Sequence, residues 1–368
     1  SAADLAAIVA AELKGANDLQ EALDRARLIG HEQAFLIGVR VLTGTISAAQ
    51  AGGAYALLAE SMIAAMQARV EHEIVRAHGR VPGGAAAVIA VGKLGGREMT
   101  AASDLDLIVI YDFDAQAVLS SGVKPLAPSQ YYSRFTQRLI SAFTAPTAEG
   151  ILYPVDMRLR PSGQKGPVAT QLASFLHYQA SEAWTWEHMA LTRARVVSGP
   201  PALRAAVETA IREVLLKPRD RTKTAADVRD MRARIEKEKG TRDPWELKQV
   251  RGGLVDLEFI AQYLQLVHAP AHPRILSQNT VEALENLAGA GVLEPTAADA
   301  LLPAARLLNN LTQVLRLCLD ERFEPAKAPD GLKSLLARAG DAPDFRHLEA
   351  ELVAREAEVA TLFDQLIV

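Results

Sequence analysis

The chain has 368 residues with 40 basic and 44 acidic side chains, and its formal net charge of −4 excludes the strongly basic surface expected of a nucleic-acid-binding protein. Its one cysteine, Cys318, excludes an intramolecular disulfide and fits a reducing compartment. No apolar stretch approaches a membrane span and the alanine-rich start does not resemble a signal peptide, so we expect a cytoplasmic protein without a membrane segment.

Residues 1–80 are expected to form a helical lead-in. Alanine, leucine, glutamate and arginine dominate this part of the chain, and apolar residues recur at helical spacing, as at Met62, Met66 and Val70. The segment Gly79–Gly84 contains a proline and three glycines, which interrupt helices. We therefore expect a boundary there.

Residues 81–200 are expected to form a domain built on a small mixed sheet. The clearest strands by composition and alternation are Val88–Val91, Leu105–Tyr111 and Val155–Leu159. A helix over Tyr131–Phe143 is expected to connect the second strand to the third.

Residues 201–368 are expected to form a C-terminal helical bundle. The longest candidate helices cover Leu254–Val267, Thr296–Asp320 and the segment from Asp344 to the end of the chain. The whole pattern predicts an α+β fold that is predominantly helical, with a small mixed sheet, flanking helices and a helical bundle.

A glycine-rich segment followed by two aspartates is the strongest signal of a functional site. An apolar run ends at Gly92, the pair Gly95-Gly96 follows, and Ser103 leads into Asp104 and Asp106. Alternate residues of a strand share a face, so the two carboxylates point the same way. Close carboxylates repel each other unless a cation lies between them, and glycine backbone can approach phosphate oxygens. The pattern predicts a nucleotide and magnesium.

A second segment, Val155–Pro161, alternates apolar and polar residues and places Asp156, Arg158 and Arg160 on one face. Asp156 would add a third carboxylate, and the arginines would contact phosphate oxygens. Three aspartates on adjacent strands suit metal-assisted nucleotidyl transfer, in which one carboxylate accepts the proton of the nucleophile. An Asp-x-Asp pattern alone fits an ordinary strand after a glycine turn, but the neighbouring motifs favour the functional interpretation.

Four segments resemble, in order, the glutamine synthetase adenylyltransferase family. They are Gly-Lys-Leu-Gly-Gly with Ser-Asp-Leu-Asp-Leu, then Val155–Gly163, Glu182–Arg195 and Leu247–Leu264. That family carries two similar nucleotidyltransferase halves in one polypeptide, and this chain has room for one. Pro-Ser-Gly after the arginines and Glu-Ala-Trp-Thr-Trp-Glu-His are most like the C-terminal half, which adenylylates.

The resemblance implies a polymerase-β-like nucleotidyltransferase fold with its catalytic domain in residues 81–200, Mg²⁺, and ATP as the AMP donor. It implies transfer of AMP to a tyrosine hydroxyl of glutamine synthetase, with release of pyrophosphate, as part of nitrogen regulation. The catalytic and metal-binding residues would be Asp104, Asp106 and Asp156. The expected nucleotide contacts are Gly92, Gly95, Gly96, Ser103, Arg158 and Arg160.

Other functions stay open at this point. The related half of the family would remove AMP by phosphorolysis, and a regulatory module would bind a PII-type signal protein and glutamine. The three intact aspartates argue against a purely regulatory role. A nucleotidyltransferase acting on RNA or small molecules is least favoured, because the chain lacks a basic surface.

The sequence does not decide the roles of several charged residues in these motifs. Arg193 and Arg195 follow a tryptophan-rich segment. The tryptophans are expected to wedge a helix against the sheet, and the alternative is a functional segment whose two arginines reach the triphosphate. Asp256 lies near the start of a helix, where an acidic side chain favours the helix dipole, or it faces the active site. The residues left unassigned are Lys93, Arg193, Arg195, Lys248 and Asp256.

Overall fold

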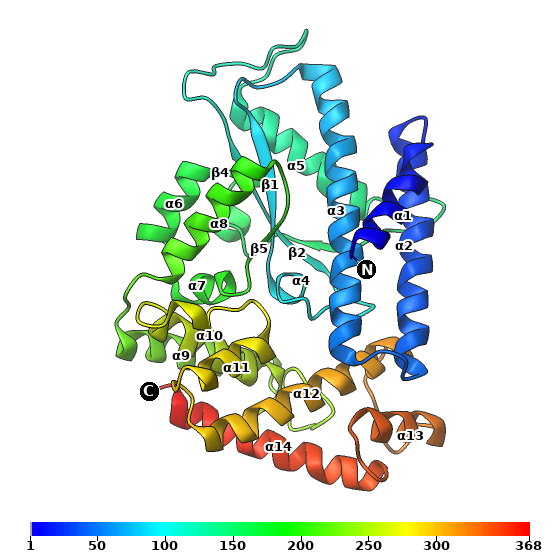
Figure 1. Cartoon of the computed structure of the whole chain (residues 1–368), viewed down its shortest axis with the longest axis vertical. Helices are drawn as coiled ribbons and strands as arrows, with labels where there is room; N and C mark the ends of the chain where they lie inside the picture. Colours follow the sequence, from blue (N-terminus) through cyan, green and yellow to red (C-terminus); the bar gives the residue numbers. More distant parts are fainter. Residues whose placement is uncertain (1) are drawn as a thin grey trace.

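The structure is a computed structural model that describes residues 2–368. Its first three helices lie beside the sheet, and the third is long (Figure 1): α1 (Ala2–Lys14), α2 (Leu19–Leu42) and α3 (Ala48–His78). α3 begins at a capping box, in which the Ser47 hydroxyl accepts the Gln50 N–H at 3.2 Å and the Gln50 side chain accepts the Ser47 N–H. The helices predicted for this part of the chain are confirmed.

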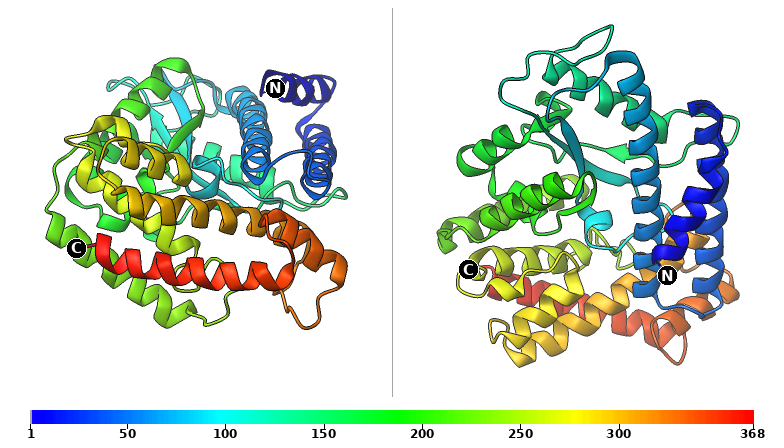
Figure 2. Two further views of the ribbon diagram at one scale, coloured as in Figure 1. Left: turned by 60° about the horizontal axis from the view of Figure 1, so that its bottom comes forward. Right: turned by 45° about the horizontal axis from the view of Figure 1, so that its top comes forward.

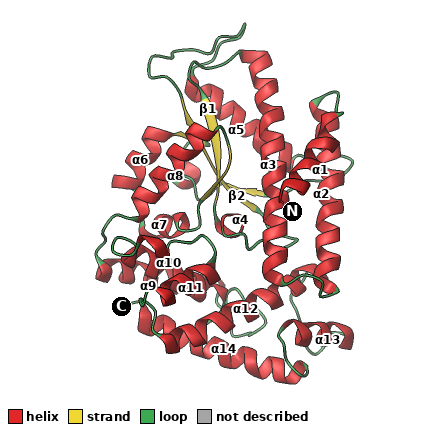
Figure 3. Cartoon of the chain, in the orientation of Figure 1, coloured by secondary structure: helices red, strands yellow, loops and turns green. Residues whose placement is uncertain are grey.

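A small mixed sheet occupies the centre of the molecule (Figure 3). Its strand order is β3-β2-β1-β5. β4 pairs with the later part of β2, on the same edge of β2 as β3. β1 is antiparallel to β2 and β5, whereas β3 and β4 are parallel to β2. The strands are β1 (Ala85–Ala90), β2 (Leu105–Asp112), β3 (Val155–Asp156), β4 (Ala169–Gln171) and β5 (Arg195–Ser198). The predicted α+β fold, mostly helical around a small mixed sheet, is confirmed.

Short helices and one longer helix connect these strands. The helix expected over Tyr131–Phe143 is present and slightly longer, because Pro128 stands in its first turn, where a missing N–H costs nothing. The elements are α4 (Gly92–Gly95), α5 (Pro128–Thr144), the 3₁₀ helix η1 (Gly163–Lys165), α6 (Leu172–Ser181), α7 (Thr185–Leu191) and α8 (Pro201–Leu215).

The rest of the chain is helical, as predicted. In both views of Figure 2, α12 runs beside α14, and the two helices are in contact. Across residues 2–368, no helix combines the length and apolarity needed to cross a membrane. The elements are α9 (Arg221–Lys239), α10 (Leu254–His268), the 3₁₀ helix η2 (Pro273–Ile275), α11 (Thr280–Gly289), α12 (Pro295–Cys318), α13 (Asp330–Ala339) and α14 (Phe345–Leu366).

Both faces of the sheet are buried, each against a different hydrophobic core. Successive residues of β1 point to opposite faces: Val88 packs with α1–α3 and α5, and Ile89 packs in a core shared with the C-terminal helices. Because Ile89 and Leu257 belong to one core, the sheet and the C-terminal helices pack as neighbours. The three-domain division at residues 80 and 200 stays a prediction.

The prediction of a strand over Val155–Leu159 is wrong beyond its second residue. β3 ends at Asp156 because the side chain of Asp156 accepts the N–H of Arg158 at 2.8 Å and so turns the chain. The N–H of Arg160 then donates to the Met157 carbonyl at 3.2 Å, which continues the turn. Two short strands, β4 and β5, were not predicted.

Candidate active site

The carboxylates of Asp104, Asp106 and Asp156 meet where β2 begins. Asp104 directly precedes β2, and Asp106 is its second residue. The parallel register of β2 and β3 pairs Asp106 with Asp156, and paired residues project from the same face of a sheet. The structure therefore brings together the three aspartates that the sequence selected.

Asp106 is a half-buried carboxyl with uncompensated negative charge. Burial, followed by the charges of Asp156 and Asp104, raises the pKa of Asp106 to about 6. Lys248 and Arg193 act in the opposite direction with smaller effect. Within the described part of the chain, no hydrogen bond or ion pair to this carboxylate is found. Such a group is suited to binding a cation.

Asp156 differs from Asp106 because it has a cationic partner. Arg158 Nε donates to Asp156 Oδ2 at 2.7 Å, in addition to the backbone bond that ends β3. Burial acts to raise the pKa of Asp156, but the hydrogen bonds and charge of Arg158 outweigh it and lower the pKa below its ordinary value. Arg158 itself is largely exposed, with 71% of its side chain accessible, so it can move without disturbing the core.

The donor chemistry of this site fits magnesium. Mg²⁺ is usually bound through one or two carboxylates together with substrate phosphates, and Asp104 and Asp106 offer carboxylates of this kind. Asp156 is turned toward Arg158, and among residues 2–368 no group of three His, Cys, Asp or Glu side chains is arranged to hold a metal. The assignment of all three aspartates as metal ligands stays a prediction.

Gly92 is the glycine of the motif that touches the carboxylates. It begins α4 with a positive φ of 57°, a conformation that favours glycine. A Cβ atom at this position would collide with the Asp106 carboxylate. Any larger residue would therefore displace Asp106 from its place beside Asp156.

Gly95 and Gly96 are buried and face Arg193. A Cβ atom on Gly95 would collide with the Arg193 carbonyl, and one on Gly96 would lie 2.5 Å from the Arg193 guanidinium. The structure thus explains both glycines by close packing. The phosphate contacts expected from Gly95 and Gly96 stay predictions.

Ser103 and Arg160 are also engaged within the protein. The Ser103 hydroxyl accepts the Thr100 N–H at 2.9 Å, which shapes the turn before Asp104. The Arg160 guanidinium donates to the carbonyls of Met157 at 2.8 Å and Pro167 at 3.1 Å, and so closes the loop after β3. Nucleotide contacts by Ser103, Arg158 and Arg160 stay predictions, and Arg158 is the most exposed of the three.

Arg193 forms a buried network that the sequence did not reveal. Its guanidinium pairs with Glu98, and it pairs with Glu258 of α10 at 2.9 Å, while only 4% of Arg193 is exposed. Glu98 also accepts the N–H of Thr280, at the start of α11, at 3.0 Å. The segment between Gly96 and Asp104 is therefore held against the C-terminal helices.

Arg195 also contacts α4. It pairs with Glu60 of α3 at 2.5 Å and donates to the carbonyls of Gly95 and Leu94 at 3.1 and 3.0 Å. Both arginines of this motif therefore position the glycine-rich segment. Arg193 and Glu98 lie 95 positions apart in the chain, and a contact over such a separation leaves no periodic signal in the sequence.

Asp256 is fully buried and paired. It accepts the Gly252 N–H at 2.6 Å and pairs with Arg251 at 3.1 Å and with Arg232. All of these partners belong to the C-terminal helices and the turn before α10. Asp256 is therefore a structural residue of this region.

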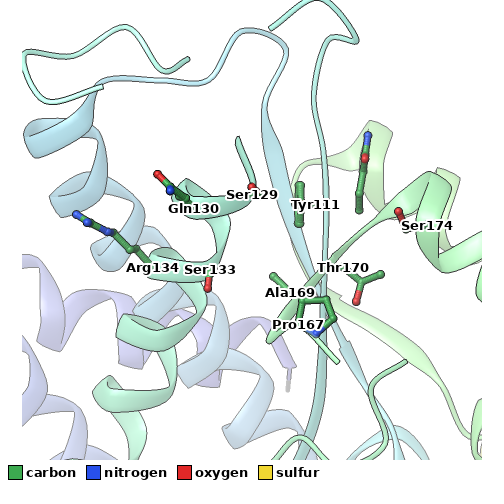
Figure 4. A pocket seen from close by; sticks show the side chains of 10 residues that line it. Tyr111, Ser129, Gln130, Ser133, Arg134, Pro167, Ala169, Thr170 and Ser174 are labelled. Carbon is green, nitrogen blue, oxygen red and sulfur yellow. The ribbon is translucent and has the colours of Figure 1, made fainter. Parts of the chain in front are cut away.

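A cavity of about 540 Å³ lies at the other end of β2 from the three aspartates. Figure 4 shows Ser129 and Arg134 of α5 on one side of Tyr111, with Thr170 and Ser174 on the other. No Asp, Glu, His, Cys or Lys lines this cavity, so it lacks the groups that metal-assisted transfer needs. The carboxylates at the start of β2 are therefore the candidate active site.

Comparison with known families gives two matches along the chain. A family model described as glutamate-ammonia ligase adenylyltransferase matches residues 1–210. A second model, described as GlnD PII-uridylyltransferase, matches residues 229–367. The first match contains the whole candidate site, and the second begins within α9.

Several curated bacterial proteins are similar over nearly the full chain. A bifunctional glutamine synthetase adenylyltransferase/adenylyl-removing enzyme of Rhodopseudomonas palustris (strain HaA2) is 54% identical over 99% of this chain and 37% of its own length. Proteins of the same description from Bradyrhizobium sp. (strain ORS 278) and Xanthobacter autotrophicus are 51% and 54% identical over 99% and 95% of the chain. The chain spans 35–37% of the length of these relatives. The matches confirm the family resemblance expected from the motifs.

Proposed function

The chain belongs to the glutamate-ammonia ligase adenylyltransferase family, and we propose that it transfers AMP from ATP to a tyrosine hydroxyl of glutamine synthetase, with release of pyrophosphate. The observation that carries this proposal is the carboxylate cluster at the start of β2, in which Asp106 has a pKa of about 6 and no cationic partner among the described residues. A nucleotidyltransferase needs such a site, because charge develops on phosphate oxygens during transfer.

Asp104 and Asp106 would hold Mg²⁺, which supplies positive charge to the phosphates when it is bound. Gly92 keeps Asp106 in place by close packing, and Arg193 and Arg195 hold the glycine-rich segment rigid. Asp156 accepts the proton of the attacking tyrosine hydroxyl. The exposed Arg158 moves away from Asp156 and contacts a phosphate oxygen instead. The pKa of Asp156 then rises toward its ordinary value.

We propose the adenylylating direction for this chain. The segments Pro161–Gly163 and Glu182–His188 support it, because they are most like the C-terminal half of the family. The alternative is phosphorolytic removal of AMP, which uses the same carboxylates with orthophosphate as the attacking group. The relatives of this chain are described as carrying both activities, so a direct assay must separate adenylylation from AMP removal.

The partners follow from the same proposal. Glutamine synthetase is the protein substrate, and a PII-type signal protein and glutamine are effectors of the reaction. The match of residues 229–367 to a PII-uridylyltransferase model supports a regulatory contribution from the C-terminal helices. The single cysteine supports a reducing, cytoplasmic location.

The test follows label from ATP into glutamine synthetase. The parent should transfer label from α-labelled ATP and none from γ-labelled ATP. Asp106→Asn should lower the rate by about 1,000-fold, because a metal contributes several kcal/mol to transition-state stabilisation. Asp112→Asn, at the other end of β2, is the matched control and should retain the parental rate.

Two results would reject the proposal. One is label transfer by Asp106→Asn at the parental rate. The other is release of ADP from adenylylated glutamine synthetase and phosphate by a parent protein that transfers no label, which would assign the adenylyl-removing direction.

A further inference from the structure

A cationic cavity lies between α4 and the C-terminal helices. Its volume is about 180 Å³, and its lining includes Lys93 of α4, Lys248 from the turn before α10, and Arg316 from the last turn of α12. Sites that enclose a whole small-molecule ligand occupy roughly 300–1,000 Å³. This cavity is therefore suited to one part of a larger ligand or to a small ion.

Three of the four cations that line this cavity form no ion pair with a described residue. Among the described residues, Lys93, Lys248 and Arg316 have no carboxylate within 4 Å, although other cations of the region do. Arg322 also lines the cavity, but it pairs with Asp243 at 2.5 Å and Glu246 at 3.4 Å. The lining also includes the carboxylates of Glu246, Asp320 and Glu321, so the excess of positive charge is one unit.

Lys93 is the innermost of these cations. Burial lowers the pKa of Lys93, Glu258 acts to raise it, and the charges of Lys248 and Arg316 lower it further. A cation placed among other cations is destabilised unless an anion joins the cluster. Two acidic residues of the lining, Asp320 and Glu321, follow the C-terminal end of α12. Neither carboxylate forms an ion pair with Lys93.

The cavity adjoins the candidate active site. Lys93 follows Gly92, which packs directly against the Asp106 carboxylate. Lys248 is also close enough to Asp106 to lower its pKa against the effect of burial. A ligand between Asp106 and Lys248 would meet a metal-binding carboxylate at one end and cations at the other.

We propose that this cavity binds the β- and γ-phosphates of a nucleoside triphosphate and holds the pyrophosphate that leaves. Lys93, Lys248 and Arg316 contact the phosphate oxygens, so the C-terminal helices complete a nucleotide site whose carboxylates lie on the sheet. An inorganic diphosphate carries several negative charges in a small volume, and the unpaired Lys93, Lys248 and Arg316 are the groups that would contact it. This inference rests on the proposed function, because it assigns part of the same site.

The test measures pyrophosphate binding by calorimetry, first in metal-free buffer and then with Mg²⁺. Lys248→Gln and Arg316→Gln should each weaken binding by about tenfold, since a charged hydrogen bond of this kind is lost. Both side chains are exposed, so the variants should remain folded, and unchanged thermal melting would verify this. AMP, which lacks the two outer phosphates, should bind all variants equally.

Two matched variants complete the design. Lys248→Arg keeps a cation in the cavity and should restore most of the pyrophosphate affinity. Lys237→Gln removes an exposed cation of α9 outside the cavity and should bind pyrophosphate as the parent does. The inference is overturned if both glutamine variants in the cavity keep the parental affinity. It is also overturned if the cavity binds an acidic peptide such as oligoglutamate but not pyrophosphate.

Failure of this inference differs from failure of the proposed function. If pyrophosphate affinity is unchanged in the variants while label transfer proceeds, the cavity assignment is wrong and the function stands. If the variants lose pyrophosphate affinity but the parent labels no glutamine synthetase, the phosphate site stands and its reaction is a different one.

Discussion

Asp106 and Asp256 each follow a glycine pair in the sequence, yet their surroundings are opposite. Asp256 is fully buried and pairs with Arg232 and Arg251 while accepting a backbone N–H. Asp106 lies beside two other carboxylates, and no cationic partner of its side chain is found among the described residues. The charge of Asp256 is neutralised within the protein, whereas the charge of Asp106 requires a ligand to neutralise it.

Charge compensation therefore separates structural from functional polar residues more clearly than motif membership does. Arg193 and Arg195 belong to a family motif, but their carboxylate partners are Glu98, Glu258 and Glu60. Lys93 and Lys248 lack such partners among residues 2–368, and they line the cavity beside Asp106. The groups available for ligands are therefore concentrated where the sheet meets the C-terminal helices.

Removal of the compensated carboxylate should have the largest effect on stability. Asp256→Ala leaves Arg232 buried without its partner, so we expect a loss of about 3–5 kcal/mol in the free energy of unfolding, measured by urea denaturation. Asp230→Ala removes an exposed i,i+4 pair with Arg234 and should cost at most about 0.5 kcal/mol. Equal losses in the two variants would contradict the distinction between compensated and surface charges.

A gentler change tests the second compensated network. Arg193→Lys keeps one positive charge but cannot contact Glu98 and Glu258 through a planar fork, so we expect a loss of about 2–3 kcal/mol. The control is Arg306→Lys, in an exposed pair with Glu285, where the loss should stay below about 1 kcal/mol. A parental urea midpoint for Arg193→Lys would show that the buried network does not need both contacts.

Glu356, in the middle of α14, is a third type of carboxyl: it is buried and one of its oxygens has no hydrogen-bond partner. Burial, with a smaller effect from Asp243, raises the pKa of Glu356 to about 8 from an ordinary 4.5. The folded state therefore holds a proton that the unfolded state releases, and the free energy of unfolding falls as the pH rises from 4.5 to 8.

Glu356→Gln should remove this pH-dependent loss. Between pH 5 and pH 8 the parent should lose about 3 kcal/mol more than the variant in urea denaturation. Glu358→Gln, at an exposed position of the same helix, serves as the control and should follow the parent. If parent and Glu356→Gln show the same pH profile, this carboxyl is not protonated in the folded protein.

The smallest expected stability change is at Asp106 itself. Asp106→Asn removes a charge that burial and two neighbouring carboxylates disfavour, so the free energy of unfolding at pH 8 should rise by about 1 kcal/mol. The gain should vanish below about pH 4, where the carboxyl is protonated in the unfolded chain as well. A loss of stability at pH 8 would mean that this carboxylate already has a partner.

Local patterns predicted much of the fold and the position of the site. Apolar spacing located the long helices, including α10 and α12, because an amphipathic helix repeats its pattern over many residues. Alternation and glycine chemistry located β2 and its two aspartates. Asp156 was grouped with them from the alternation of Val155–Pro161, and the β2–β3 register brings it to Asp106.

The parts that were missed depend on contacts between distant residues. β4 has only three residues, too few for a periodic signal, and β3 ends early because the Asp156 side chain bonds the backbone of Arg158. The pairing of Arg193 with Glu98 joins positions 95 apart. The cationic cavity draws its lysines and arginine from α4, the turn before α10 and the end of α12, so only the folded chain assembles it.

Asp106 forms no ion pair among the described residues, and we expect a divalent metal to bind there. Titration of the protein with Mn²⁺, followed by electron paramagnetic resonance or calorimetry, tests this directly. We expect binding by the parent and by Asp112→Asn, and at least about tenfold weaker binding by Asp106→Asn. Equal Mn²⁺ affinity in the parent and Asp106→Asn, or no binding to the parent, would contradict it.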